Sequence, residues 1–348
     1  MPDATQAVEP AVPTIDARAL TRALSRYREA STSRGIVELL ITAIPLGLLW
    51  ILMWAALWLG HVWLYVFLLI PAAAFLLRLF MIQHDCGHGA FLRSRRANDV
   101  VGRVIGVLTL TPYDYWRRTH AAHHAGAGNL DRRGMGDVAT LTVGEYQTRS
   151  KWSRFCYRLY RHPLVMFGLG PFYLFFVQNR VPIGLMQAGR QPWISTILTN
   201  AGIASLAGAA IWLIGIFPFL LLYVPVGILA GSVGVWLFYI QHQFEETLWV
   251  ESEDWNAQDA ALHGSSHYDL PIILRWFTAN IGIHHVHHLV SRIPYYRLPE
   301  VMRDYPFLRD VSRLTLLQSF RCVRLVLWDE TRRRLISFVE MRRMCDAA

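Results

Sequence analysis

Cysteine and charge are both scarce in this chain of 348 residues. The cysteines lie far apart and form no CxxC motif, which argues against a disulfide framework and against a cysteine-ligated iron–sulfur cluster. Charged residues make up 17% of the chain, less than in a typical soluble domain.

Residues 1–34 contain no apolar core of the signal-peptide kind, and residues 17–29 are expected to form an amphipathic helix on the membrane surface.

Four long apolar runs account for the mean hydropathy of +0.27. They cover residues 39–59, 62–82, 195–217 and 219–240, and Arg78 is the one charged residue inside them. At about 1.5 Å of rise per residue, about 20 helical residues cross a hydrocarbon core of about 30 Å. Buried helices of a soluble protein are the alternative, but four such runs in one chain favour four membrane spans.

The runs form two pairs with very short connections. Gly60 and His61 separate the first two runs and Pro218 separates the last two, so each pair is expected to be a tight hairpin. None of the 34 basic residues lies in either turn, and an excess of Lys and Arg marks the cytoplasmic side. Both termini and both large polar segments are therefore expected in the cytoplasm. The shorter apolar stretch 164–177 contains two glycines and a proline, and is expected to be interfacial or re-entrant.

Three histidine clusters indicate where the chemistry takes place. They read HDCGH at 84–88, HAAHH at 120–124 and HHVHH at 284–288. On a helix, positions i, i+3 and i+4 share one face, so the histidines within each cluster can converge. His285 points about 100° away from His284 and is expected to stand apart. The other eight are more than one metal ion can hold: His84, His88, His120, His123, His124, His284, His287 and His288.

The order of clusters and runs places this chemistry at the membrane. Because both pairs of runs are hairpins, all three clusters are expected on the same side, where they can meet. Imidazole suits Fe, Zn, Cu and Ni, and eight nitrogen ligands suit two redox-active ions better than one catalytic zinc, for which no HExxH motif is present. A metal pair that activates O₂ supplies the oxidising power that side chains lack. No flavin, nicotinamide or haem-binding motif is visible, so electrons must come from outside the chain.

The three clusters resemble the histidine boxes of membrane fatty acid desaturases in both spacing and order. The likeness continues in HDCGHGAFLRSRRAN at 84–98, YWRRTHAAHHAGAGNLDRRGMGD at 115–137, QHQFEE at 241–246 and NIGIHHVHHLVSRIP at 280–294. It covers roughly residues 81–299 and is similar to the bacterial omega-6/delta-12 acyl-lipid branch. The resemblance implies a non-haem di-iron centre, O₂ as oxidant, and a cis double bond made from a CH₂–CH₂ pair of an acyl chain.

The resemblance also implies residue roles. The eight box histidines take the iron-ligand role, and His242, just after the fourth run, takes that of a ninth ligand, with a hydrogen-bonded interfacial histidine as the alternative. His267 is expected to be structural, or to support a ligand from behind. Asp85, Asp137 and Glu245 either orient a box histidine or are solvated. The aromatic candidates either line the acyl tunnel or are interfacial anchors: Trp116, Trp276 and Phe277. The basic candidates either hold a phosphate-bearing headgroup or an electron donor, or are ordinary charges flanking the spans on the cytoplasmic side: Arg117, Arg118, Arg132 and Arg133.

The predicted fold is an all-α integral-membrane protein with a cytoplasmic helical cap around a di-metal site. Residues 1–34 form a cytoplasmic segment, 35–299 the desaturase-like membrane domain and 300–348 a cytoplasmic helical tail. A bacterial inner membrane is the expected location. The chain's net charge of +9 fits contact with anionic lipid rather than nucleic acid, because the basic residues are scattered around the spans.

The substrate is expected to be an acyl chain on a membrane lipid or another acyl carrier. No fused cytochrome b5 domain is present, so the donor is expected to be a separate ferredoxin-like or cytochrome-type carrier. The alternative within the same superfamily is a hydroxylase or ketolase acting on carotenoids or alkanes. Alternatives from another class, a haem-binding electron carrier or a scaffold, would not require histidines at these spacings outside the spans.

Overall fold

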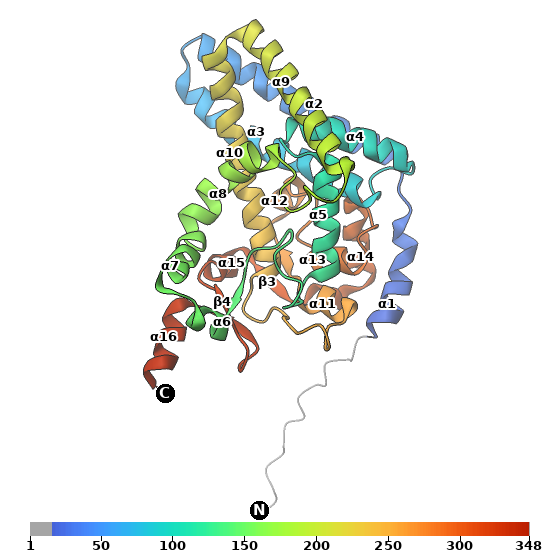
Figure 1. Cartoon of the computed structure of the whole chain (residues 1–348). Coiled ribbons are helices and arrows are strands. Elements are labelled where there is room, and N and C mark those ends of the chain that lie inside the picture. Colours follow the sequence, from blue (N-terminus) through green and yellow to red (C-terminus); the bar gives the residue numbers. More distant parts are fainter. Residues whose placement is uncertain (1–15, 348) are drawn as a thin grey trace, which may run out of the picture.

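The computed structural model describes residues 16–347 and is mainly helical (Figure 1). Its longest elements are α2 (Thr32–Trp58), α3 (Val62–His88), α9 (Arg190–Ile214) and α10 (Ile216–His242), which include the four apolar runs. Helices of 25–27 residues are about 40 Å long, more than a bilayer core of about 30 Å requires. The four expected spans are thus helices long and apolar enough to cross a membrane. Residues 1–15 of the predicted N-terminal segment lie outside the described residues.

The two hairpin turns lie together at one end of the helix bundle (Figure 1). Gly60 adopts a φ of +77° in the first turn, and the His61 N–H donates to the Ala56 carbonyl at 2.8 Å. In the second turn the prediction was wrong: Gly215, with a φ of +85°, separates the helices, and Pro218 lies in the first turn of α10. Proline is tolerated there because the first N–H groups of a helix have no intrahelical partner, whereas glycine readily adopts positive φ.

The outer surface of the bundle is apolar. Half of the apolar window of α3 is buried, compared with 6% of that of α9, so α3 is central and α9 peripheral. Large side chains near the turns are almost fully exposed, including Trp63 (71%), Trp212 (84%) and Phe217 (77%). A soluble protein rarely exposes so large an apolar surface, so lipid must cover it. The chain is an integral membrane protein.

A cap of shorter elements lies at the other end of the spans (Figure 1). Its helices are α1 (Ala17–Leu24), α4 (Arg95–Leu108), α5 (Tyr113–Gly126), α6 (Val143–Thr148), α7 (Lys151–Tyr160), α11 (Ala257–His263), α12 (Ile272–Phe277), α13 (His284–Leu289), α14 (Leu298–Asp304), α15 (Leu316–Cys322) and α16 (Phe338–Ala347). A main hydrophobic core runs without a break from the spans into this cap. The cap is therefore packed onto the bundle as one body with it.

Short strands join distant parts of the cap. Strand β4 (Leu327–Asp329) pairs in parallel with β1 (Leu141–Thr142) and antiparallel with β5 (Arg334–Ile336), and β2 (His267–Asp269) pairs in parallel with β3 (Arg313–Thr315). The expected C-terminal helical tail is thus not purely helical, since β3, β4 and β5 belong to it. These strands are two or three residues long, too short to give a clear alternating pattern in the sequence.

The apolar stretch 164–177 packs along α10 on the cap side. It consists of two wide π-helical turns, Val165–Leu169 and Tyr173–Val177, on either side of α8 (Gly170–Phe172). Phe167 packs on Trp236 and Tyr239 of α10 with ring centroids 5.1 and 5.3 Å away. Since the histidine clusters before and after it come together, the stretch returns to the side from which it starts, as the sequence predicted.

The N-terminal helix forms, and its apolar side packs against the protein instead of remaining free for the predicted contact with the membrane surface. The apolar side of α1 and the following turn is buried in the protein core, including Leu20, Leu24 and Tyr27. The Tyr27 hydroxyl also donates to the Asp304 carboxylate at 2.5 Å, at the end of α14. An amphipathic pattern cannot distinguish a protein surface from a lipid surface, because both bury the same apolar stripe.

Candidate metal centre

The first histidine cluster occupies the last turns of α3. The helix continues past the apolar run to His88 and ends at Gly89, whose φ of +67° closes it with a left-handed cap. His84 and His88 are one turn apart on the same helix face, with ring centroids 4.8 Å apart. A membrane span therefore directly positions two imidazoles at the cap.

The second cluster lies on α5, which is fixed against α3. The hydroxyl of Tyr113, in the first turn of α5, donates to the Cys86 carbonyl at 2.8 Å. The Tyr113 ring lies against Gly102 of α4, where an added Cβ would be 2.2 Å from the ring. Glycine at 102 thus permits the close approach that orients α5, and with it the second cluster.

The third cluster forms the short helix α13. Six residues are too few for a stable isolated helix, so its position depends on tertiary contacts. Just before it, Gly282 lies against the backbone of Tyr268, where an added Cβ would be 2.4 Å from the Tyr268 carbonyl oxygen. The third cluster is therefore located by its flanking segments.

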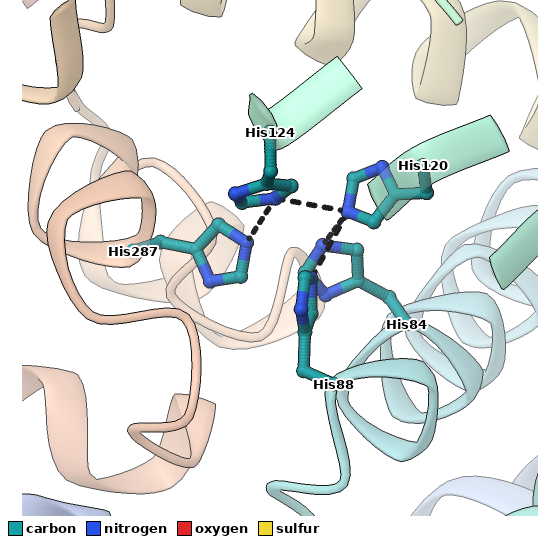
Figure 2. Close-up of side chains that lie close together, drawn as sticks. All are labelled: His84, His88, His120, His124 and His287. Atoms are coloured by element: carbon teal, nitrogen blue, oxygen red, sulfur yellow. Dashed lines mark hydrogen bonds between the residues drawn. The ribbon is translucent and has the colours of Figure 1, made fainter. Parts of the chain in front are cut away.

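The nine predicted ligand histidines converge in two groups. In each group one ring nitrogen per histidine lies within 4.8 Å of all the others. The first group contains five histidines from α3, α5 and α13 (Figure 2): His84, His88, His120, His124 and His287. The second contains four from α5, α10 and α13: His123, His242, His284 and His288.

The nitrogen separations in both groups suit a metal ion better than hydrogen bonds. His120 Nε2 lies 3.0 Å from the Nε2 atoms of His84 and His88 and 3.1 Å from that of His124 (Figure 2). One imidazole nitrogen either donates a single proton or accepts, so these contacts cannot all be hydrogen bonds. Two ligands at right angles, each about 2.1 Å from one ion, are about 3.0 Å apart. The first group therefore fits a metal ion.

The second group has the same spacing. His242 Nε2 lies 3.1 Å from His123 Nε2 and 3.0 Å from His284 Nε2, and His284 Nε2 lies 3.1 Å from His288 Nε2. His242 therefore lies among the box histidines, although it comes from the end of a different span. These residues fit a second ion next to the first.

Burial keeps the imidazoles neutral. Removal from water disfavours the charged form, and repulsion between neighbouring rings adds to this effect. Both lower the pKa well below the usual value for the cap histidines His120, His124, His284, His287 and His288. A neutral imidazole is the form that binds a metal ion, so the groups are ready to do so at neutral pH.

Several ligand candidates are held by a partner on their other ring nitrogen. The Asp137 carboxylate contacts His123 Nδ1, and the Gly264 carbonyl lies 3.0 Å from His242 Nδ1. Asp85 Oδ1 lies 3.3 Å from His84 Nδ1, and the Tyr295 N–H donates to Asp85 Oδ2 at 2.7 Å. Such partners fix the tautomer and the ring orientation of metal-binding histidines. Of the three acidic candidates, Asp85 and Asp137 contact a box histidine.

Other candidates lie elsewhere. Glu245 is at the surface, paired with Arg334. His285 lies outside both groups, as predicted, and is 2.9 Å from the Leu308 carbonyl through Nε2; burial lowers its pKa to about 3. His267 Nδ1 lies 2.6 Å from the Arg309 carbonyl, which indicates a structural role.

The aromatic and basic candidates divide in the same way. Trp116 stacks on His120, with centroids 4.6 Å apart and planes at 14°, so it borders the first group. The Trp276 ring lies against the guanidinium of Arg78, which belongs to the membrane-spanning helix α3. Arg117 pairs with Asp99 at 2.9 Å. Among the described residues, no hydrogen bond, ion pair or ring stacking joins a grouped histidine to the remaining candidates, which are Phe277, Arg118, Arg132 and Arg133.

Sequence reasoning found Asp85 and Asp137 but missed other residues that hold the clusters in place. Tyr113 and Tyr295 contact the backbone or side chain of the first cluster, and the Gly264 carbonyl supports His242. Each contact joins segments at least 22 residues apart. No local spacing indicates such contacts; the occurrence of Tyr295 soon after the third cluster is the nearest signal.

These features define a membrane-spanning protein with a histidine-rich site suited to two metal ions. The chain belongs to the fatty acid desaturase family, whose sequence model matches residues 61–313. It is 41% identical over 319 residues to a "Fatty acid desaturase" of Bacillus subtilis, covering 92% of this chain and 90% of that protein. The chain is thus an oxidoreductase of the desaturase class, as the histidine boxes predicted.

Relatives with more specific names are more distant. The "sn-1 oleoyl-lipid 12-desaturase" of Synechocystis sp. is 27% identical over 284 residues, covering 78% of this chain and 75% of that protein. The "sn-1 acyl-lipid omega-3 desaturase (ferredoxin)" of the same organism is 30% identical over 229 residues, with coverages of 63% and 61%. The named relatives therefore include two different double-bond positions.

Proposed function

We propose that this protein introduces a cis double bond into an acyl chain of a membrane lipid, with omega-6/delta-12-like selectivity. The observation that supports this most strongly is the convergence of nine imidazoles in two adjacent groups at the end of the membrane spans. The balanced reaction converts CH₂–CH₂, O₂, two electrons and two protons into CH=CH and two water molecules. The electrons come from an external ferredoxin-like or cytochrome-type donor, and the ferredoxin in the name of the Synechocystis omega-3 desaturase supports the former.

In this proposal the first group holds one iron ion and the second group holds the other. Bound iron supplies O₂ activation. His84, His88, His120, His124 and His287 are the first set of ligands, and His123, His242, His284 and His288 the second. Asp85 and Asp137 orient their histidines from behind. The buried surroundings exclude bulk water, which protects the oxidising site from side reactions.

The unit of function in this proposal is residues 35–299. The proposal assigns the flanking segments 1–34 and 300–348, and the cap, to the cytoplasmic side of a bacterial inner membrane. The absence of Lys and Arg from both hairpin turns supports this orientation, because basic residues accumulate on the cytoplasmic side. A site at that side is accessible both to a soluble electron donor and to acyl chains in the bilayer.

Expression in a host whose lipids are saturated or monounsaturated tests the reaction. Mass spectrometry of the fatty acid methyl esters should show a new double bond and its position, and a His123→Ala variant with normal membrane insertion should make none. Product from that variant would remove His123 from the ligand set. Hydroxylated or ketolated products from the wild type would contradict the desaturase reaction and favour the related hydroxylases and ketolases.

A further inference from the structure

A buried ion pair lies within the membrane-spanning helices. Arg78 of α3 and Glu38 of α2 are each 2% exposed, and the Arg78 Nη2 group donates to Glu38 Oε2. Charges inside a membrane are costly and are kept where they have a function. Arg78 is six residues before His84, so it lies about 9 Å along the helix from the first group. The pair is thus close to the site but is not part of either histidine group.

The Arg78 guanidinium contacts more than α2. Its Nε–H donates to the Thr42 hydroxyl at 3.2 Å, which links α3 to α2. Its Nη1 group donates to the Trp276 carbonyl, and the guanidinium lies 3.9 Å from the centroid of the Trp276 ring. Trp276 belongs to α12, eight residues before the third cluster begins at His284. A pair that merely joined α2 to α3 would not require this contact.

The segment that follows the third cluster also contacts this ion pair. The Tyr295 hydroxyl donates to Glu38 Oε2 at 3.1 Å, and the Tyr295 N–H donates to Asp85 at 2.7 Å. The Asn280 side-chain amide donates to the Tyr295 carbonyl at 3.1 Å and so closes the loop. Both flanks of α13 are therefore attached to one buried pair and to the helix of the first cluster.

We propose that Arg78 and Glu38 are positioning residues that set the place of the third histidine cluster relative to the first. The inference rests on the ligand role proposed for these histidines. Helix α13 is too short to hold itself, yet it supplies His287 to the first group and His284 and His288 to the second. A shift of this helix would disturb both groups at once. A buried charge pair suits the task because its geometry is narrowly defined.

Hydrogen exchange on the full-length, metal-free protein tests the proposal without relying on iron. Arg78→Gln should raise exchange of backbone amides in residues 276–295 at least tenfold, since the loss of one charged hydrogen bond costs about 1.4 kcal/mol or more. Residues in the first hairpin turn should keep their wild-type exchange. The iron bound per chain after reconstitution should fall below that of the wild type, and Arg78→Lys should restore part of both properties. Unchanged exchange in 276–295, or an increase spread evenly over α2 and α3, would overturn the proposal.

Two milder variants distinguish positioning from simple helix joining and remain informative if Arg78→Gln does not fold. Tyr295→Phe removes the flank contact and leaves the ion pair, whereas Thr42→Val removes an α2–α3 contact and leaves the flanks. Positioning predicts the larger change in exchange and iron content for Tyr295→Phe; an equal or larger change for Thr42→Val contradicts it. Wild-type protein that binds no iron would refute the proposed function, whereas the exchange comparison would still test the positioning role of Arg78 and Glu38.

Discussion

The Asp137 carboxylate should control the affinity of one iron ion and not of the other. It contacts His123 Nδ1, and the two side chains are 7% and 1% exposed, so the contact is shielded from water. Asp137→Asn keeps the shape but removes the negative charge that orients the imidazole and increases its basicity. Loss of such a partner lowers metal affinity about 10–100-fold, or about 1.4–2.7 kcal/mol. Because His123 belongs to the second group, the second ion should bear this loss.

Iron reconstitution with a competing chelator measures this effect. At a chelator concentration where the wild type keeps two ions per chain, Asp137→Asn should keep about one, with its desaturation rate reduced accordingly. Glu245→Gln is the matched control, because Glu245 is 57% exposed and pairs with Arg334 at the surface. Wild-type affinity for both ions in Asp137→Asn would refute the role of Asp137. Simultaneous weakening of both ions would refute the assignment of His123 to a single group.

The remaining predictions test the ligand set, the approach to the third cluster and the orientation in the membrane. His242→Ala should lose the second ion and the activity, whereas His285→Gln, in the third cluster but outside both groups, should keep both ions; iron content per chain decides this. Gly282→Ala should cost about 1–3 kcal/mol of stability by pushing against backbone, whereas Gly208→Ala, with open space around it, should leave the thermal midpoint nearly unchanged; equal effects would contradict this packing. Cys156, exposed on α7 in the cap, should react with a membrane-impermeant maleimide in inverted vesicles and not in intact cells; the reverse pattern would place the cap outside.

The family and the two-group site together explain the wide distribution of the histidines along the chain. A single helix can direct two or three imidazoles to one point, because positions i, i+3 and i+4 share a face. Nine imidazoles gathered in two groups therefore require several helices. In this fold the last turns of α3 and α10 bring their histidines together with those of α5 and α13. The membrane spans thus act as rigid supports for the histidines at their ends.

Local patterns in the sequence were sufficient for the spans, the box histidines and their common side. Apolar runs of 21–23 residues specify membrane helices regardless of their neighbours, and helical spacing determines which histidines share a face. His285 could be set aside on this basis alone. The second turn was misplaced because glycine and proline can each end a helix, and the sequence contains both Gly215 and Pro218. Only the backbone conformation showed that Gly215 forms the turn.

Contacts between elements were decided by the tertiary structure. The division of the histidines into groups of five and four separates His123 from His124, neighbours in sequence, because adjacent helical residues point in different directions and face different partners. The choice of Asp137 over Glu245 and the attachment of Trp276 and Tyr295 to Arg78 likewise depend on helix packing. The sequence by itself determined which residues are available for metal binding, and tertiary packing decided which of them meet, since distances across helices have no counterpart in local spacing.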